Sequence, residues 1–409
     1  GFNSVGPEGA GELARNASWS NLQVLDLSQN SISDKGAEEL GKNESWRNLQ
    51  SLNLESNSIG PNGMRELTKN KTWLNLQVLN LENNLLGPKG AAELSRNVAW
   101  ASIQNINLQN NSIGEEGAAA LSKNNLWAKL HTLNLQGNSI SDKGVEELSK
   151  NKTWTNLRVL NLQRNSISDK GAKALSKNTN WFNLQTLDLK TNNIKFEGAE
   201  VLSKNVAWTR LETLILWENE IGAAGVAALI KNTTWKDLQT LDLSYSSIDT
   251  AGAQDLGRNK TWINLEALNL RANKIYSQGI EVLSKNETWT KLQRLNLWDN
   301  LIGPEGAKAL SENTIWTNLQ VLNLRSNNIQ AEGARELGKN KSWIQLQSLN
   351  LWDNAIGAEG AAKLGENTAW TNLRTLDLSY NSIGSEGAKE LSKNTSWVNL
   401  EELDLKYND

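Results

Sequence analysis

The sequence predicts an α/β solenoid of about fifteen stacked repeats, curved into a horseshoe with a parallel sheet on its concave side and short helices on its convex side. Two observations predict this fold class. Tryptophan recurs every 27 residues from Trp19 to Trp397, fifteen times in all. Between these tryptophans the same positions carry leucine, asparagine, isoleucine, glycine and alanine, so one such stretch is the structural unit.

The first half of each repeat predicts a strand. Leu25 and Leu27 are separated by one polar residue, which is the period of a strand with one buried face. Ile32 follows after a turn and is expected to point inward. Asn30 recurs in fourteen of the fifteen repeats, with Ser246 as the exception. Its amide offers a donor and an acceptor to backbone groups at the turn, so we expect a structural role for this column.

The second half of each repeat predicts a helix of about two turns. All four prolines of the chain occupy one repeat position, and proline is tolerated at the first helical residue. In other repeats Ser33 and Asp34, or their equivalents, are expected to cap the helix start. Ala37 and Leu40 lie on one helical face. Asn43 is expected to end the helix in the left-handed conformation.

The whole unit reads L-x-x-L-x-L-x-x-N-x-I-x-x-x-G-A-x-x-L-x-x-N-x-x-W and resembles the leucine-rich repeat. Its G-A-x-x-L half is similar to the ribonuclease-inhibitor-like class, which includes the sensor regions of NOD-like receptors and Ran GTPase-activating proteins. The resemblance covers essentially the whole chain. It implies the horseshoe fold and leaves the partner open, because one fold serves many functions.

We expect residues 1–409 to form a single solenoid. Residues 1–18 are interpreted as the helix half of a partial first repeat, and residues 400–409 as the strand half of a partial last repeat. Neither end shows a polar capping unit, and an uncapped stack tends to associate. End-to-end self-association, as a structural element, is therefore the alternative function.

The composition of the chain argues against nucleic-acid and membrane binding, catalysis and metal binding. The 42 basic and 45 acidic residues give a net charge of −3, which predicts neither a nucleic-acid nor a membrane partner. Cysteine is absent, so thiol catalysis and cysteine-ligated metals are excluded. The single histidine, His131, replaces a surface glutamine, and Asp377 and Asp404 lack the surroundings of a catalytic or calcium-binding pair. We expect no enzyme, no cofactor and no metal, and favour a cytoplasmic location while leaving a secreted one open.

The repeats differ most at strand residues that point away from the core. Two adjacent columns, which begin at Ser28 and Gln29, hold all three tryptophans outside the 27-residue period and three of the four tyrosines. Aromatic and arginine side chains are the usual anchors of protein interfaces. We therefore predict a non-enzymatic recognition scaffold that binds a protein or folded peptide on the concave face of repeats eight to fifteen. The predicted contact residues are Trp217, Glu218, Tyr245, Arg271, Trp298, Asp299, Arg325, Trp352, Asp353, Tyr380, Lys406 and Tyr407.

A second interpretation of the same residues is open at this stage. Arg271, Trp298, Arg325 and Trp352 lie on successive rungs, so they are able to stack as a cation–π ladder worth ~0.5–1 kcal/mol per contact. Such a ladder would satisfy its own surface without a partner. It would equally serve as a pre-ordered binding platform.

Overall fold

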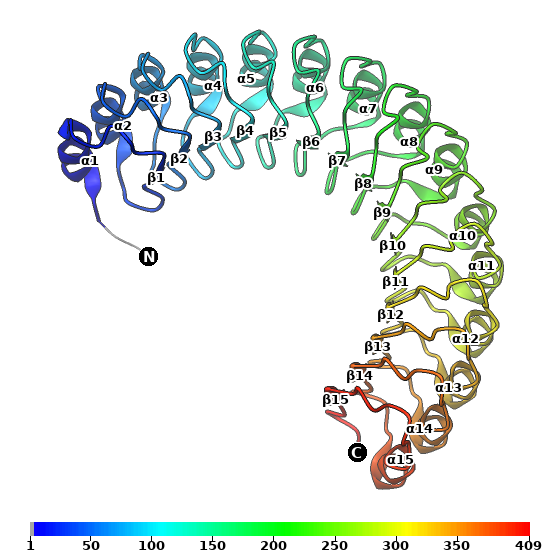
Figure 1. The fold of residues 1–409 in the computed structure, drawn as a ribbon. Coiled ribbons are helices and arrows are strands. Elements are labelled where there is room, and N and C mark those ends of the chain that lie inside the picture. The colour runs from blue at the N-terminus through cyan, green and yellow to red at the C-terminus, as the bar shows by residue number, and fades with distance from the viewer. Residues whose placement is uncertain (1–3) are drawn as a thin grey trace. The chain divides into compact units, whose positions relative to one another are not determined.

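A computed structural model describes residues 4–409; the first three residues of the predicted partial repeat lie outside the described residues. Fifteen helices alternate with fifteen strands in this part of the chain. It divides into two compact units, one comprising the described residues up to Ile194 with Lys204–Leu211, the other Lys195–Ser203 and Glu212–Asp409. A single solenoid over the whole chain stays a prediction. Each unit by itself is a stack of repeats (Figure 1).

The elements are short, with three residues in each strand and eight to ten in each helix. The first unit contains α1 (Gly6–Arg15), β1 (Val24–Asp26), α2 (Ser33–Gly41), β2 (Ser51–Asn53), α3 (Pro61–Thr68), β3 (Val78–Asn80), α4 (Gly87–Ser95), β4 (Asn105–Asn107), α5 (Gly114–Leu121), β5 (Thr132–Asn134), α6 (Ser141–Ser149), β6 (Val159–Asn161), α7 (Asp169–Ser176) and β7 (Thr186–Asp188). The second contains α8 (Phe196–Ser203), β8 (Thr213–Ile215), α9 (Gly222–Leu229), β9 (Thr240–Asp242), α10 (Thr250–Gly257), β10 (Ala267–Asn269), α11 (Tyr276–Leu283), β11 (Arg294–Asn296), α12 (Gly303–Ser311), β12 (Val321–Asn323), α13 (Gln330–Gly338), β13 (Ser348–Asn350), α14 (Gly357–Gly365), β14 (Thr375–Asp377), α15 (Gly384–Leu391) and β15 (Glu402–Asp404).

Within each unit the strands pair in parallel and in chain order. Paired residues are 27 positions apart, as Leu25 is from Leu52 and Leu376 is from Leu403. In both units the strands line the inner side of the stack and the helices the outer side (Figure 1). The predicted α/β solenoid of parallel strands and short helices is therefore confirmed.

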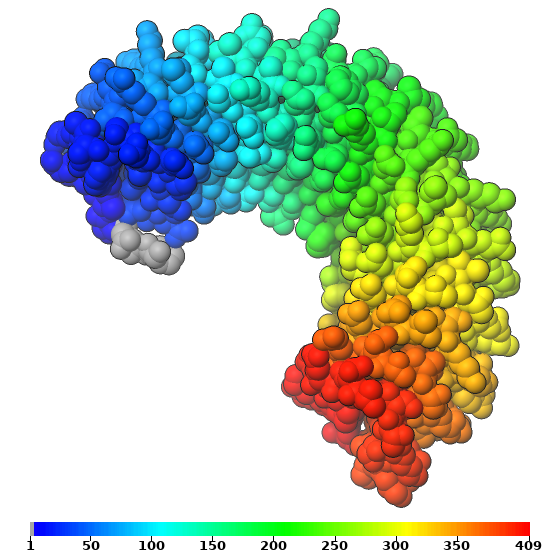
Figure 2. All heavy atoms as spheres, in the orientation of Figure 1, coloured from blue at the N-terminus to red at the C-terminus, as the bar shows by residue number. Residues whose placement is uncertain are grey.

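The core consists of the repeating aliphatic residues and the periodic tryptophans. From Trp46 to Trp370 each periodic indole is at most 1% exposed, whereas Trp19 is 42% exposed. Neighbouring indoles stack, with 6.4 Å between the ring centroids of Trp46 and Trp73. In Figure 2, where all heavy atoms are drawn as spheres, the atoms of successive repeats of each unit lie against one another. Each repeat thus buries its apolar face against its neighbours, which is why one repeat cannot fold alone.

The asparagine that follows every strand but β9, where Ser246 replaces it, holds successive repeats together. The Asn57 side-chain oxygen accepts from the backbone N–H groups of Asn30 and Ile32, at 3.0 and 3.2 Å. Its amide nitrogen donates to the Leu27 carbonyl at 2.8 Å. These buried backbone groups have no strand partner, so the side chain supplies one. The structural role predicted for this column is confirmed.

The helix ends differ from the expectation. Asn43 and its equivalents are not among the residues with positive φ, so the predicted left-handed stop is wrong. The side chain acts instead: the Asn43 oxygen accepts from the N–H of Trp46 at 2.9 Å, and its amide donates to the Ala14 carbonyl of the preceding helix at 2.7 Å. Ser33 and Asp34 do not cap their own helix, and Asp34 accepts from the Gly60 N–H of the next repeat at 2.6 Å. The equivalent Ser168 does cap α7 as predicted, accepting from the Lys170 N–H at 3.3 Å.

The repeat glycine makes room for neighbouring helices. A Cβ built on Gly333 in α13 would lie 2.6 Å from Ile329 Cγ2 and 2.9 Å from Ala307 Cβ of α12. Real Cβ atoms essentially never approach so closely. The φ of Gly333 lies in the ordinary helical range, so the backbone conformation does not require a glycine there. The close packing of α12 and α13 does.

Candidate protein-binding surface

The candidate surface is built on the ends of strands β8–β15 in the second unit. Trp298 follows β11 and Trp352 follows β13, each after an inward leucine. The Trp298 N–H donates to the Asn296 side-chain oxygen at 3.1 Å, and the Trp352 N–H to Asn350 at 3.0 Å. At Trp298 and Trp352 the Asn that ends the strand thus holds the backbone that carries the ring, whereas the strand before Trp217 ends in Ile215.

The Asn and Asp residues that end the strands also form side-chain hydrogen bonds with their equivalents on neighbouring rungs. These bonds are fewer than those to the N–H group two residues further along the chain. The Asn269 amide donates to Asp242 at 3.0 Å, and the Asn350 amide to Asp377 at 3.0 Å. The structure shows that the N–H group two residues further along is the more regular partner.

In each repeat the residue directly after the tryptophan column, which is the column that begins at Gln29, takes the left-handed conformation. Tyr245 has φ 51° and Tyr380 φ 57°, and each N–H bonds to a carbonyl of the following repeat, Arg271 at 2.9 Å and Lys406 at 3.0 Å. Gln29 in the first unit has φ 57°, so the conformation belongs to the repeat and does not mark the site. Its effect is to fix the backbone beneath successive rungs in register.

Eight side chains of this surface form one continuous stack, which we call the aromatic–arginine ladder. Its members, in order, are Trp217, Tyr245, Arg271, Trp298, Arg325, Trp352, Tyr380 and Tyr407. The Arg271 guanidinium carbon lies 5.2 Å from the Tyr245 ring centroid and 3.3 Å from that of Trp298. The Arg325 carbon lies 4.3 Å from the Trp298 centroid and 3.6 Å from that of Trp352.

The aromatic pairs at the two ends extend the stack. The ring centroids of Trp217 and Tyr245 are 6.2 Å apart, and those of Trp352 and Tyr380 are 4.8 Å apart. Tyr380 and Tyr407 follow at 4.4 Å. The three tryptophans are half-buried, while Tyr245 and Tyr407 are 43% and 69% exposed. The rings are therefore ordered by one another and still open to solvent.

Two serines explain how tyrosines from the neighbouring column enter the ladder. Ser244 and Ser379 occupy the tryptophan column but are only 1% and 2% exposed. Tyr245 contacts both Trp217 and Arg271, which lie one rung either side of Ser244. The small serine thus leaves space that the next residue fills. Sequence reasoning missed this, although the triplet Leu-Ser-Tyr occurs at both places.

The remaining predicted residues lie beside the ladder rather than in it. Asp299 and Asp353 are exposed on the rungs of Trp298 and Trp352, and Glu218 is exposed next to Trp217. Lys406 forms an ion pair with Asp404 at 2.9 Å, so its charge is already partnered. The structure therefore brings eight of the twelve predicted residues into direct contact and leaves these four at the rim.

A shallow pocket of about 320 Å³ lies on the same face. It spans β9–β12, next to the Arg271 and Trp298 rungs, and Ala267 leaves room for it among larger neighbours. Arg294 and Val321 form part of its lining. A pocket of this size accepts one or two side chains of a partner.

The other candidate sites do not form chemical centres in the described residues. Burial and then the nearby Arg158 lower the pKa of His131, and its ring makes no side-chain hydrogen bond within residues 4–409. Asp377 accepts from Ser379 at 2.8 Å, whereas Lys406 holds the pKa of Asp404 below its ordinary value. Within the described part of the chain no group of three potential ligands could hold a metal ion. Nor does any helix there have the length and apolarity that crossing a bilayer requires.

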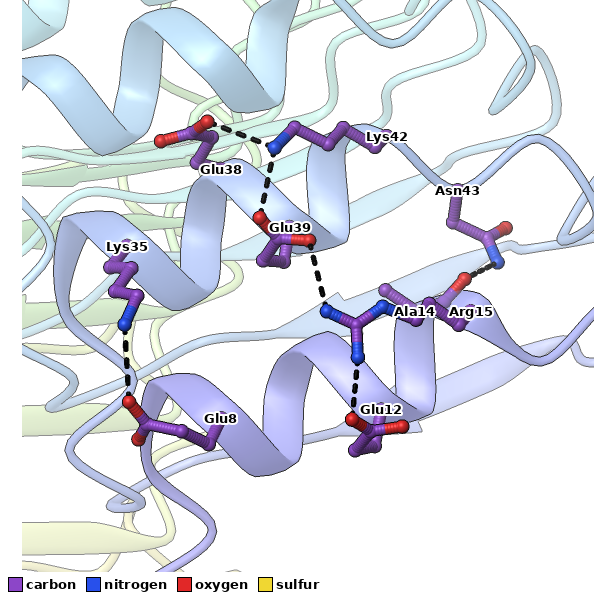
Figure 3. A network of polar contacts seen from close by, with 9 residues as sticks. All are labelled: Glu8, Glu12, Ala14, Arg15, Lys35, Glu38, Glu39, Lys42 and Asn43. Carbon is purple, nitrogen blue, oxygen red and sulfur yellow. Dashed lines mark hydrogen bonds and ion pairs between the residues drawn. The ribbon is translucent and has the colours of Figure 1, made fainter.

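Several basic residues on the helical side are paired with acids. Figure 3 shows Lys42 of the α2 end between Glu38 and Glu39, at 2.9 and 2.8 Å, and Lys35 on Glu8 at 3.2 Å. Exposed pairs of this kind contribute little stability. They describe a solvated face with balanced charge.

Comparison with known proteins agrees with this architecture. A family model described as "Leucine Rich repeat" matches residues 20–41, 47–67, 128–149, 155–176, 182–203, 290–311, 317–338, 345–365 and 371–392. These nine segments of the chain are therefore leucine-rich repeats. No curated protein sequence matches the chain.

Two solved structures show how far the likeness extends. An internalin from Listeria monocytogenes matches with a TM-score of 0.56 and 21% identity, over 97% of this chain and 94% of the internalin. A TDR receptor matches with a TM-score of 0.48 and 17% identity, over 97% of this chain and 66% of the receptor. At this identity the internalin shows the fold alone.

Proposed function

We propose that the second unit is a non-enzymatic recognition surface that binds a protein or folded-peptide partner on its concave face. The contact residues are the aromatic–arginine ladder together with Glu218, Asp299, Asp353 and Lys406. One observation carries the proposal: eight aromatic and arginine side chains from successive repeats touch in an unbroken row while their rings stay open to solvent. These residue types dominate interface energetics, and exposed aromatic surface is otherwise avoided.

The dimensions and the rigidity of the ladder support a macromolecular partner. Trp217 and Tyr407 are seven rungs apart, or ~34 Å at ordinary strand spacing. That length exceeds any ordinary small-molecule site. The backbone beneath is bonded from rung to rung, as between Asp299 N–H and the Arg325 carbonyl at 2.9 Å. Because the side chains are stacked before binding, little conformational entropy remains to be lost.

The cation–π stack and a binding platform are compatible interpretations of the ladder. Arg271 and Arg325 place two guanidinium groups between rings, and this contact orders the side chains before any partner binds. Neither forms an ion pair within the part of the chain that the structure describes.

We also assign the repeats to the ribonuclease-inhibitor-like class, because each repeat contains an α-helix of eight to ten residues.

Affinity capture from a lysate of the source organism tests the proposal. The bait is the full chain, compared with a variant in which Trp217, Trp298 and Trp352 are all changed to Ala. A matched control changes three exposed apolar residues outside the ladder, Phe182, Ile263 and Ile344, to Ala. The native chain and the control should recover the same partner and the tryptophan variant should lose it. Equal recovery by all three baits would show that the ladder is not the interface.

End-to-end self-association is the alternative function. Trp19 and Leu403, each 42% exposed, are apolar residues of the first and last repeats that such an assembly would cover. Sedimentation over a range of concentrations separates the two functions. A constant monomer supports recognition, and species that grow with concentration support assembly.

A further inference from the structure

Two amide groups in the pocket over Ala267 have no acceptor in the described part of the chain. They belong to Asn296 of β11 and Asn323 of β12, which both line the pocket of about 320 Å³. The side-chain oxygen of each accepts from the N–H group two residues further along, at 3.1 Å in both cases. The amide nitrogens form no hydrogen bond within residues 4–409. An amide nitrogen only donates, so both groups are open to an acceptor from outside the chain.

The ladder explains why these two amides lack a partner. In the first unit the equivalent amide of Asn107 donates to Glu82, which lies 25 residues earlier in the preceding repeat, at 2.9 Å. The same position before Asn296 and before Asn323 is occupied by ladder residues, an arginine and a tryptophan. Neither side chain contains an acceptor. The residues that build the ladder therefore also leave two donors unpaired in the pocket beside it.

Arg294 places a cation at the same end of the pocket. It begins β11, two residues before Asn296, so the two side chains leave one face of the strand ~6.7 Å apart. It is exposed and forms no ion pair or ring contact among the residues that the structure describes. The β9 end holds Asp242, whose carboxylate already accepts from Ser244 and Asn269. The donors that lack acceptors are thus gathered at β11 and β12.

One carboxylate satisfies all three of these groups. Neighbouring strands are ~4.8 Å apart, so the amides of Asn296 and Asn323 each reach one oxygen of the same carboxylate. Its charge pairs with the Arg294 guanidinium, and charge-assisted hydrogen bonds are about twice as strong as neutral ones. A neutral carbonyl would leave that guanidinium without a counter-ion. Ala267 and Val321, which also line the pocket, offer apolar contact to the methylene groups of an acidic side chain.

We infer that this pocket is the subsite for one acidic side chain, glutamate or aspartate, of the protein partner. The carboxylate accepts from the amides of Asn296 and Asn323 and from the guanidinium of Arg294, and its stem lies over Ala267. The inference rests on the proposed function of the concave face. It adds a specificity-determining contact that the ladder itself does not make.

A phage-displayed library of random peptides, selected on the full chain, supplies the probe. The recovered peptides are screened again on A267L, in which the larger side chain fills the pocket. T132L makes an aliphatic leucine in the same column of the first unit and is the matched control. We expect peptides that bind the native chain and T132L equally and bind A267L at least about tenfold more weakly, a loss of about 1.4 kcal/mol.

Binding of one such peptide, synthesised with a fluorescent label, is then measured by anisotropy. Changing its anchoring Glu→Gln should weaken binding to the native chain about tenfold. R294Q should weaken binding of the acidic peptide as much and remove the difference between the two peptides. N296D should weaken it at least about tenfold, because a carboxylate replaces the donor. The backbone is kept in N296D, since Asp377 at the equivalent position accepts from the Ser379 N–H at 3.0 Å.

Three results overturn the inference. They are a selection without peptides that A267L loses, an unchanged affinity when every acidic residue of the peptide is neutralised, and the same Glu→Gln effect on R294Q as on the native chain. The captured protein partner gives a separate readout. A partner that the tryptophan variant loses and A267L retains would leave the proposed function standing and remove this subsite.

Discussion

Replacing Trp298 by Ala removes the ring at the centre of the ladder, and the structure sets the size of the effect. The Trp298 ring centroid lies 3.3 Å from the guanidinium carbon of Arg271 and 4.3 Å from that of Arg325. Two cation–π contacts at ~0.5–1 kcal/mol each give about 1–2 kcal/mol. The half-buried indole contributes about 2 kcal/mol more through ~100 Å² of lost apolar contact. We expect W298A to lower the free energy of unfolding by roughly 3 kcal/mol.

A double-mutant cycle isolates the ladder contact from the lost apolar area. Urea unfolding followed by circular dichroism is measured for W298A, R325M and the double variant, because Met keeps the apolar stem of the arginine. The coupling energy should be about 0.5–1 kcal/mol. Arg294 begins the same strand, β11, and makes no ring contact among residues 4–409, so the cycle of W298A with R294M is the matched control. Coupling below about 0.3 kcal/mol in the ladder pair, as in the control, would refute the stacked arrangement.

Three further predictions concern the scaffold. Asn327→Ala leaves the buried N–H groups of Asn300 and Ile302 without their acceptor, at 3.0 and 3.3 Å, so we expect a loss of about 2–5 kcal/mol in urea unfolding; a loss below 1 kcal/mol would contradict the role of the asparagine column. Gly333→Ala should destabilise despite the better helix propensity of alanine, whereas Gly11→Ala, whose nearest contact is 3.4 Å, should be neutral or stabilising by about 0.5–1 kcal/mol; the same sign for both would contradict the packing argument. Burial, and then the charge and hydrogen bond of Tyr407, raise the pKa of Tyr380 above its ordinary value of 10.0. Its ionisation is therefore disfavoured in the folded state, and its contribution to stability is lost as pH rises above 10. Ultraviolet titration should show one phenol ionising late, and four ordinary phenols would contradict this prediction.

The fold was predictable because the same pattern recurs fifteen times. A strand period at Leu25 and Leu27 has two possible registers, but repetition at a fixed interval leaves one. The same repetition placed Trp298 and Trp352 in one column, and the structure joins them through Arg325. A ladder of successive rungs follows from the register alone.

The parts that escaped prediction depend on which backbone group a polar side chain reaches. Asn43 suits a left-handed residue by its identity, yet its side chain bonds to Trp46 and Ala14, and its backbone has ordinary dihedrals. The entry of Tyr245 into the ladder depends on the volume that Ser244 leaves, which no periodicity encodes. Such choices are made by local geometry, and a pattern of residue types does not specify them.

Hydroxyl-radical footprinting of the chain with its captured partner tests the central claim most directly. Oxidation is read by mass spectrometry at Trp298, Trp352 and Tyr407 on the concave face and at exposed residues of the helical side. We predict that partner binding protects these three rings and leaves the helices α9–α14 as reactive as before. Unchanged oxidation of the rings, with protection of those helices or of the first unit, would contradict the account.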